Sequence, residues 1–219
     1  MTSTRQSYNN DLEALRQEIL SMGNKVEKAI GEAVEALVKQ DMQLAKRVMD
    51  GDDEIDDMEV DIEDRCMVLI ARQQPLAKDL RIIATGLKIA TDLERVGDHA
   101  FDIGKITLSL AGQTLIKPLV DIPRMAEMAR RMLRNSLEAY ITLDTALADQ
   151  VCQDDDAVDD IYQQILRELL TYMMEDPRNI SQAAQLLFVA RYLERVADHA
   201  TNIGEWVIYL ATGQRMRKK

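Results

Sequence analysis

The chain has 219 residues, of which 47% are hydrophobic and only 4% aromatic, and it carries a net charge of −11. A protein this acidic repels phosphates, which argues against a nucleic-acid-binding protein. Because no stretch approaches the ~18 apolar residues of a membrane span and the polar N-terminus lacks a signal-peptide core, we expect a soluble cytoplasmic protein.

Long helices are predicted in the first half of the chain, where good helix formers abound and glycine and proline are rare. A first helix is expected over residues 11–49, because Gly51 and the aspartates after it can stop one helix and cap the next. A second is expected over 53–73, ended by Pro75, and a third over 78–110. The apolar stripe of the second helix recurs at intervals of three and four residues, at Ile55, Met58, Ile62, Cys66 and Leu69.

A linker is predicted at residues 112–123, which contain one glycine and two prolines. Three more helices are expected after it, and a short basic tail closes the chain at 214–219. These helices are predicted over residues 125–152, 156–175 and 181–212.

An internal repeat organises this pattern. Residues 93–104 read LERVGDHAFDIG and residues 193–204 read LERVADHATNIG, an offset of 193 − 93 = 100. Upstream, DDEIDDM and DDAVDDI align at an offset of 103, as do Asp41 and Asp144. The repeat predicts an all-α fold of two homologous antiparallel three-helix bundles, residues 1–111 and 124–213, related by a pseudo-twofold axis. One continuous array of six helices is the alternative.

An acidic row runs along the third helix of each repeat. It consists of Glu94, Asp98 and Asp102 in the first repeat, and on a helical wheel it lies away from the apolar face. Like charges four residues apart repel each other, so a doubled row suggests a shared use. Carboxylate oxygens one turn apart can hold a hard cation. The corresponding residues of the second repeat are Glu194, Asp198 and Asn202.

A second acidic row on the preceding helix could complete such a site. Only part of this row is kept in the second repeat, so we take Asp56 and Asp159 as the additional candidate ligands. The competing interpretation is a solvated acidic face in which Arg95 and Arg195 pair with nearby carboxylates, and the spacing leaves both open. The row comprises Asp52, Asp56, Glu59 and Glu63, and its counterparts are Asp155, Asp159, Tyr162 and Leu166.

No conventional enzyme motif is present in the sequence, and we expect the protein not to be an enzyme. The chain has two histidines, His99 and His199, which we interpret as surface or packing residues rather than metal ligands. The alternative activity is a metal-dependent hydrolase built on the carboxylate rows, for which the sequence names neither a base nor a substrate pocket.

The stretches LKIATDLERVGDHAFDIG and LFVARYLERVADHATNIG closely resemble the PhoU family of phosphate-signalling regulators. The segment IARQQPLAKDLRIIATGLKI is similar to the family's loop between the second and third helices. The resemblance extends over essentially the whole chain, in both repeats.

This resemblance implies a negative regulator of the phosphate-starvation response that also modulates phosphate uptake. It implies an adaptor between the ATPase subunit of a phosphate ABC transporter and a membrane sensor histidine kinase, often as a homodimer that reaches the membrane only through its partners. Some members bind clusters of iron or other metal ions through a repeated motif, which Glu94-Asp98 and Glu194-Asp198 match. Arg81, in the similar loop, becomes a candidate contact residue, and the alternative is that it caps or braces its own helix.

Overall fold

The computed structural model describes residues 2–215, so Met1 and the last four residues of the basic tail lie outside the described part. Seven α-helices and one short 3-10 helix make up the fold, and residues 2–215 contain no strand. The helices are α1 (Thr2–Lys39), α2 (Met42–Asp50), α3 (Asp52–Gln73), α4 (Ala77–Ser109), α5 (Asp121–Thr142), α6 (Thr145–Glu175) and α7 (Ile180–Thr212), with η1 (Pro177–Asn179) before α7.

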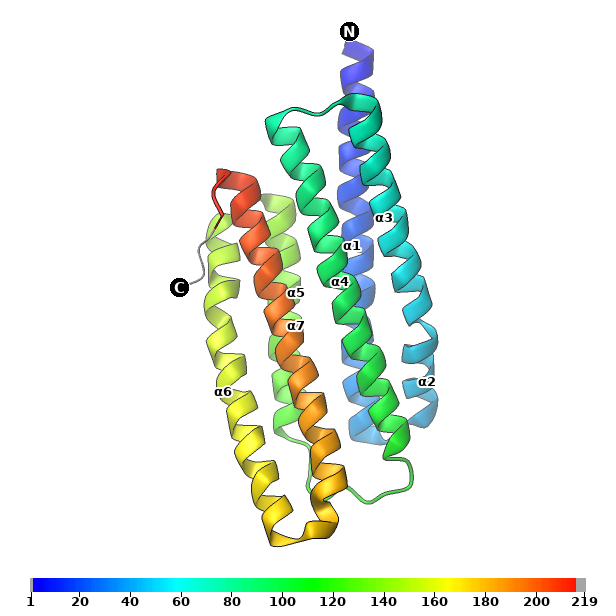
Figure 1. Ribbon diagram of the computed structural model, residues 1–219, viewed down its shortest axis with the longest axis vertical. Helices are drawn as coiled ribbons and strands as arrows, with labels where there is room; N and C mark the ends of the chain where they lie inside the picture. The colour runs from blue at the N-terminus through cyan, green and yellow to red at the C-terminus, as the bar shows by residue number, and fades with distance from the viewer. Residues whose placement is uncertain (1, 216–219) are drawn as a thin grey trace.

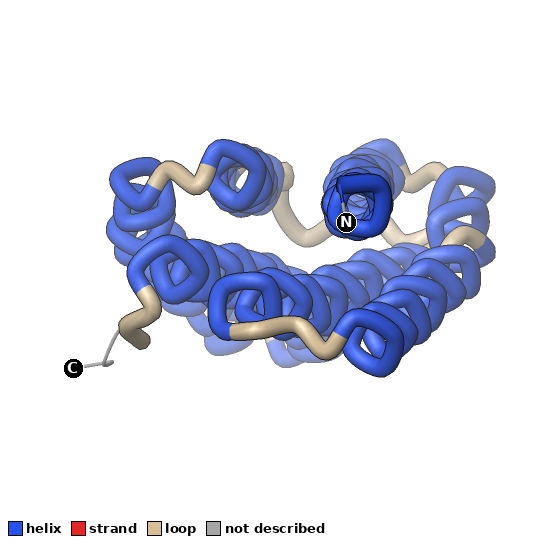
Figure 2. The backbone as a smooth tube through the Cα atoms, turned by 90° about the horizontal axis from the view of Figure 1, so that it is seen from above, coloured by secondary structure: helices blue, strands red, loops and turns tan. Residues whose placement is uncertain are grey.

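The helices form two bundles side by side, which confirms the predicted fold class. Helices α1 to α4 pack together as the first bundle, and α5 to α7 form the second. Helix α4 lies against α7, and α1 lies against α5 (Figures 1 and 2). Because α4 and α7 run in opposite directions, the two repeats are related by a pseudo-twofold axis across the long axis of the molecule (Figure 1).

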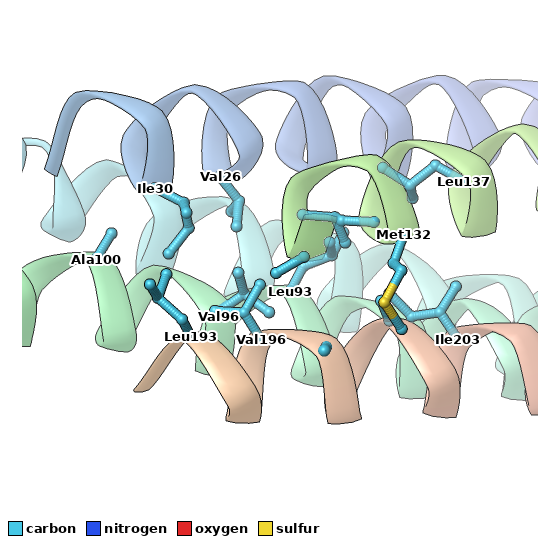
Figure 3. Packing of buried hydrophobic residues seen from close by; sticks show 14 of the residues in the cluster. Val26, Ile30, Leu93, Val96, Ala100, Met132, Leu137, Leu193, Val196 and Ile203 are labelled. Carbon is cyan, nitrogen blue, oxygen red and sulfur yellow. The ribbon is translucent and has the colours of Figure 1, made fainter. Parts of the chain in front are cut away.

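A single hydrophobic core continues through both bundles. Figure 3 shows side chains from α1, α4, α5 and α7 converging between the layers. Leu93 and Leu193, which occupy equivalent positions of the two repeats, are both fully buried. Truncating a buried leucine of this kind to alanine costs roughly 2–5 kcal/mol. The shared core therefore holds α4 and α7 of the two repeats in a fixed register.

The predicted first helix over residues 11–49 is wrong, because it breaks at Gln40 and Asp41. Gln40 has a positive φ of 51°, and the Asp41 carboxylate accepts hydrogen bonds from the backbone of residues 43 and 44 at 2.9 Å. The second repeat repeats the device at Leu143 and Asp144. Each aspartate caps a new helix, and such a cap contributes about 1 kcal/mol.

The helix break predicted between residues 152 and 156 is also wrong. Helix α6 runs without interruption through this region, whereas in the first repeat α2 ends at Asp50 and α3 begins at Asp52. The residue between them, Gly51, aligns with Asp154 at the offset of 103. Glycine favours the end of a helix, whereas aspartate can continue one. The helix is therefore interrupted in the first repeat and continuous in the second.

The connection between the bundles covers residues 110–120 and is fixed to α7. The side chain of the buried Gln182 accepts a hydrogen bond from the Ile116 backbone at 2.5 Å and donates to the Thr114 carbonyl at 3.2 Å. Helix α5 begins at Asp121, four residues before the predicted start at Met125. Pro123 lies in its first turn, where the missing N–H costs nothing.

Within residues 2–215, no helix combines the length and the apolar content needed to span a bilayer.

Candidate functional site

The acidic row of α4 faces a row of carboxylates on α3. The side chain of Glu94 is only 15% exposed. It lies within electrostatic range of Asp98 on its own helix and of Asp56 and Glu59 on α3. Carboxylates of two neighbouring helices therefore form one acidic cluster.

Asp52 joins this cluster from the first turn of α3. Its carboxylate oxygen lies 3.3 Å from the position that a Cβ would take on Gly97, so α4 approaches it closely. Burial and repulsion from Asp56 and Asp98 raise the pKa of Asp52 to about 6. At neutral pH the carboxylate is mostly ionised at an energetic cost, which a bound cation would relieve.

Glu94 is the second strongly perturbed carboxyl of the cluster. Burial, followed by repulsion from Asp98, raises its pKa to about 7. Arg95 partly offsets this effect, with its Nε 3.4 Å from Glu94 and its Nη1 3.0 Å from Asp98. The arginine is exposed and borders the cluster on the solvent side.

The second repeat forms the equivalent cluster between α6 and α7. Glu194, with a 12% exposed side chain, lies near Asp198 and Asp159, and Asp155 lies near all three. Burial and repulsion from Asp198 raise the pKa of Asp155 to about 6. The same two causes, burial first, raise the pKa of Glu194 and Asp159. The arginine paired with this cluster is Arg191, whose Nη1 donates to the Glu194 carboxylate.

The predicted candidates fall into two groups. The structure brings Asp56, Glu94 and Asp98 together in the first repeat, and their counterparts Asp159, Glu194 and Asp198 together in the second. The third members of the predicted rows, Asp102 and Asn202, lie at the junction between the repeats.

At this junction Asn202 donates a hydrogen bond to the carboxylate of Asp92, which belongs to the other repeat, at 3.2 Å. The Nδ1 of His199 lies 2.8 Å from the same Asp92 oxygen. On the opposite side of the pseudo-twofold axis, Asp102 lies beside Tyr192, and burial and this carboxylate raise the pKa of the tyrosine. The junction thus holds polar groups of both repeats face to face.

His99 is a packing residue, whereas His199 pairs with the Asp92 carboxylate. His99 is buried, its ring stacks on Tyr192 with centroids 5.4 Å apart, and it lies 5.8 Å from the ring of His199. Neither ring nitrogen of His99 has a hydrogen-bond partner. Burial, followed by the neighbouring His199, lowers the pKa of His99 to about 4, so the residue is neutral at physiological pH.

The donor chemistry of the two clusters suits a hard cation. Every candidate ligand offers carboxylate or amide oxygen, the donors that Mg²⁺, Mn²⁺ and Ca²⁺ prefer. One oxygen of Glu194, Oε2, is buried and has no hydrogen-bond partner, and Oε2 of Glu94 is in the same state apart from the ion pair with Arg95. As the side chains stand, no three His, Cys, Asp or Glu residues in the described part are placed to hold one ion. A cation would have to draw the carboxylates together by side-chain rotation.

The sequence reasoning underrated Asp52 and Asp155 and missed Arg191. Both aspartates had a usable signal, because they align at the offset of 103 and open the acidic row. Arg191 aligns with Thr91, so only a difference between the repeats pointed to it. Residue identity alone does not show that its side chain turns into the cluster.

Comparison with known proteins shows what the chain is similar to. A family model described as the PhoU domain matches it twice, over residues 19–107 and 122–207. A relative from Clostridium acetobutylicum, called a phosphate-specific transport system accessory protein PhoU homolog, is 45% identical over 214 residues, with 97% of this chain and 98% of the relative covered. A relative of the same name from Aquifex aeolicus is 48% identical over 204 residues, with 93% and 92% covered.

Solved structures agree with these relatives. The crystal structure of PhoU from Pseudomonas aeruginosa matches with a TM-score of 0.91 and 41% identity, with 94% of this chain and 100% of that chain covered. The phosphate transport system regulatory protein PhoU from Streptococcus pneumoniae matches with a TM-score of 0.89 and 29% identity, with 96% and 100% covered.

Proposed function

The chain belongs to the PhoU family, and on this premise we propose that it is a negative regulator of the phosphate-starvation response and a modulator of phosphate uptake. The observation that carries the proposal is the match of both repeats to the family, together with relatives named as accessory and regulatory proteins of phosphate transport systems. In this role it acts in the cytoplasm without binding nucleic acid, and it reaches the membrane only through its partners.

We further propose that the protein is an adaptor between the transporter's ATPase subunit and a membrane sensor histidine kinase. Two exposed apolar corners support this idea, and they lie at opposite ends of the elongated molecule (Figure 1). At the turn from α3 to α4 the exposed residues are Met67, Val68, Leu76 and Leu80. At the turn from α6 to α7 they are Leu170, Met174 and Ile180.

Two corners at opposite ends allow two partners to bind without competing for space. Exposed apolar side chains gathered at one place are typical of protein interfaces. The acidic surface between the corners would favour basic patches on the partners and speed their encounter. Arg81, in the first turns of α4, has its Nη1 3.2 Å from the position that a Cβ would take on Gly213, at the end of α7, and stays a candidate contact residue.

Charge substitutions at the corners test the adaptor role. Leu76 is 82% exposed and Met174 is 76% exposed, so glutamate at either position should leave the fold intact. We expect Leu76→Glu to lose co-purification with one partner and Met174→Glu with the other, with starvation genes active in abundant phosphate in both strains. Val60→Glu, at a 55% exposed apolar position within α3, is the matched control and should retain both partners. Retention of both partners by both corner variants would contradict the adaptor role.

Metal binding is part of the proposed function. The carboxylates of the α3–α4 and α6–α7 clusters would hold divalent or iron-type ions, and the bound ions would neutralise carboxyl groups that now repel one another. The raised pKa of Asp52, Glu94 and Asp155 and the unpartnered oxygen of Glu194 support this reading. Elemental analysis of protein purified without an affinity-tag metal tests it, and metal should be lost in the double variant Glu94→Ala/Glu194→Ala.

We also propose a homodimer, as the resemblance implies. Sedimentation equilibrium tests this directly, because one chain has a mass of 24.9 kDa. A species of twice that mass is expected, and a monomer at all concentrations up to physiological levels would refute it.

A further inference from the structure

The chain turns back on itself at the C-terminal end of α7 (Figure 1). Gly213 ends the helix with a positive φ of 75°, and its N–H donates to the Tyr209 carbonyl at 2.8 Å. The Thr212 hydroxyl accepts a hydrogen bond from the Gln214 backbone at 3.1 Å. Because glycine adopts this left-handed conformation without steric cost, the turn brings Arg215 back beside its own helix.

Two aromatic rings of α7 hold the Arg215 side chain. Its guanidinium carbon lies 5.3 Å from the centroid of the Trp206 ring and 5.6 Å from that of the Tyr209 ring. The two rings meet edge to face with centroids 5.9 Å apart. No carboxylate within residues 2–215 pairs with this guanidinium. The attraction of a guanidinium to aromatic faces, which is strongest for tryptophan, therefore holds the arginine here.

This aromatic pair, Trp206 and Tyr209, has no counterpart in the first repeat. At the offset of 100 the two positions align with Ile106 and Ser109 of α4. Because α4 and α7 occupy equivalent places in the two repeats, the shared fold does not require rings at these positions. Both rings are also partly exposed. Packing alone thus does not account for the pair, and the arginine it holds indicates what it can bind.

The rest of α7 suits a basic protein partner. The helix carries four of the nine aromatic residues of the chain, and its periodicity places all four within about 100° of one face. The other two are Phe188, which is 57% exposed, and Tyr192, and their rings stack with centroids 6.5 Å apart. Glu194 and Asp198 lie between the two ring pairs along the helix. Aromatic residues are enriched at protein interfaces, and the carboxylates favour a partner of positive charge.

We propose that Trp206 and Tyr209 form a docking site for an arginine side chain of a basic partner protein, and that Arg215 is the occupant supplied by the chain itself. A partner's arginine has to displace Arg215, so the C-terminal segment weakens docking by competing for the same rings. The site uses other residues than the two apolar corners and the acidic clusters. The inference therefore stands or falls independently of the adaptor role and of metal binding.

Nuclear magnetic resonance of the ¹⁵N-labelled full chain tests the inference. Trp206 is the only tryptophan of the chain, so one indole N–H signal reports on the site. The probe is a free peptide with the sequence of residues 212–219, TGQRMRKK, and the control peptide has lysine in place of both arginines. We expect the probe to shift the indole signal and to bind Arg215→Ala about tenfold more tightly than the wild type. The control peptide, which has the same charge, should bind Arg215→Ala more weakly than the probe does.

Matched variants separate this site from a general attraction to an acidic protein. Adding Tyr209→Leu to Arg215→Ala should remove most of the gain in affinity, whereas Gln214→Ala should bind the probe as the wild type does. Circular dichroism melting of each variant checks that it is folded. Equal affinity of the probe for the wild type and Arg215→Ala would overturn the inference, as would equal binding of both peptides to Arg215→Ala.

Two further measurements test other occupants of the same surface. Vesicles containing anionic lipid are added to the peptide-free protein, and the protein is separately concentrated without peptide. The indole signal should stay in place in both. A shift caused by the vesicles would overturn the inference in favour of a membrane surface, and a shift that depends on protein concentration would overturn it in favour of a second copy of the chain.

Discussion

Replacing Glu94 by glutamine should stabilise the metal-free protein at alkaline pH. Glutamine keeps the size of the side chain but removes a carboxylate whose pKa is raised from 4.5 to about 7. A shift of this size corresponds to about 3 kcal/mol of unfolding free energy when the group is ionised. The side chain is 15% exposed and the neighbouring Arg95 partly neutralises the Glu94 carboxylate. We therefore expect a smaller gain in unfolding free energy, of about 1–2 kcal/mol at pH 8.

The sign of the pH dependence follows from the raised pKa. The folded protein holds the proton on Glu94 more tightly than the unfolded chain does. Its stabilising contribution is therefore fully present below pH 4.5, and it is lost as the pH rises through about 7. The advantage of Glu94→Gln should accordingly be largest at pH 8, shrink as the pH is lowered, and disappear below pH 4.5.

Urea unfolding in the presence of chelator, measured at several pH values, provides the test. Glu194→Gln is the comparison variant, because it takes from Arg191 its ion-pair partner, whereas Arg95 keeps Asp98 in Glu94→Gln, and we expect a smaller gain in stability. An unchanged or lower free energy of unfolding for Glu94→Gln at pH 8 would refute the electrostatic account of the cluster. A gain that persists below pH 4.5 would assign the effect to packing.

Three further predictions concern the fold. Asp41→Ala and Asp144→Ala should each lower the free energy of unfolding by about 1 kcal/mol in urea melts, because each removes a helix cap; an unchanged midpoint would mean that the caps are dispensable. Gly204→Ala should destabilise the fold by about 1 kcal/mol in thermal melts, since its Cβ would lie 3.0 Å from the Ala148 carbonyl oxygen. A more stable variant would show that α6 and α7 leave room for a methyl group at this position. Neutral His99 contributes stability that is present above pH 6.5 and lost as the pH falls to about 4. His99→Phe should therefore lose less unfolding free energy than the wild type when the pH is lowered. An unchanged loss of unfolding free energy at acid pH would contradict this.

The overall fold could be predicted because its signals are local and duplicated. The repeated LERV…DHA…IG segment and the apolar stripes specify two sets of amphipathic helices, and α4 and α7 end within a residue of their predicted limits. Helix ends that depend on one residue were harder. Asp41 and Asp144 had been aligned with each other, yet both were placed inside a helix, because an aspartate that caps a helix looks the same in sequence as one on its surface.

The candidate site was predictable within one helix but not between helices. A helical wheel places Glu94 and Asp98 on one face, and the structure agrees. It carries no information on the register of α4 against α7, so the contact of Asn202 with Asp92 could not be foreseen. The path of the long Arg191 side chain into the second cluster likewise depends on packing against α6.

The most direct test of the proposed regulatory function is made in cells. The gene is deleted, the strain is grown in abundant phosphate, and alkaline phosphatase is assayed as a reporter of the starvation genes. We predict high activity despite plentiful phosphate, restored to low activity by the wild-type gene. Low activity in the deletion strain would contradict the proposal that this protein keeps the starvation response off.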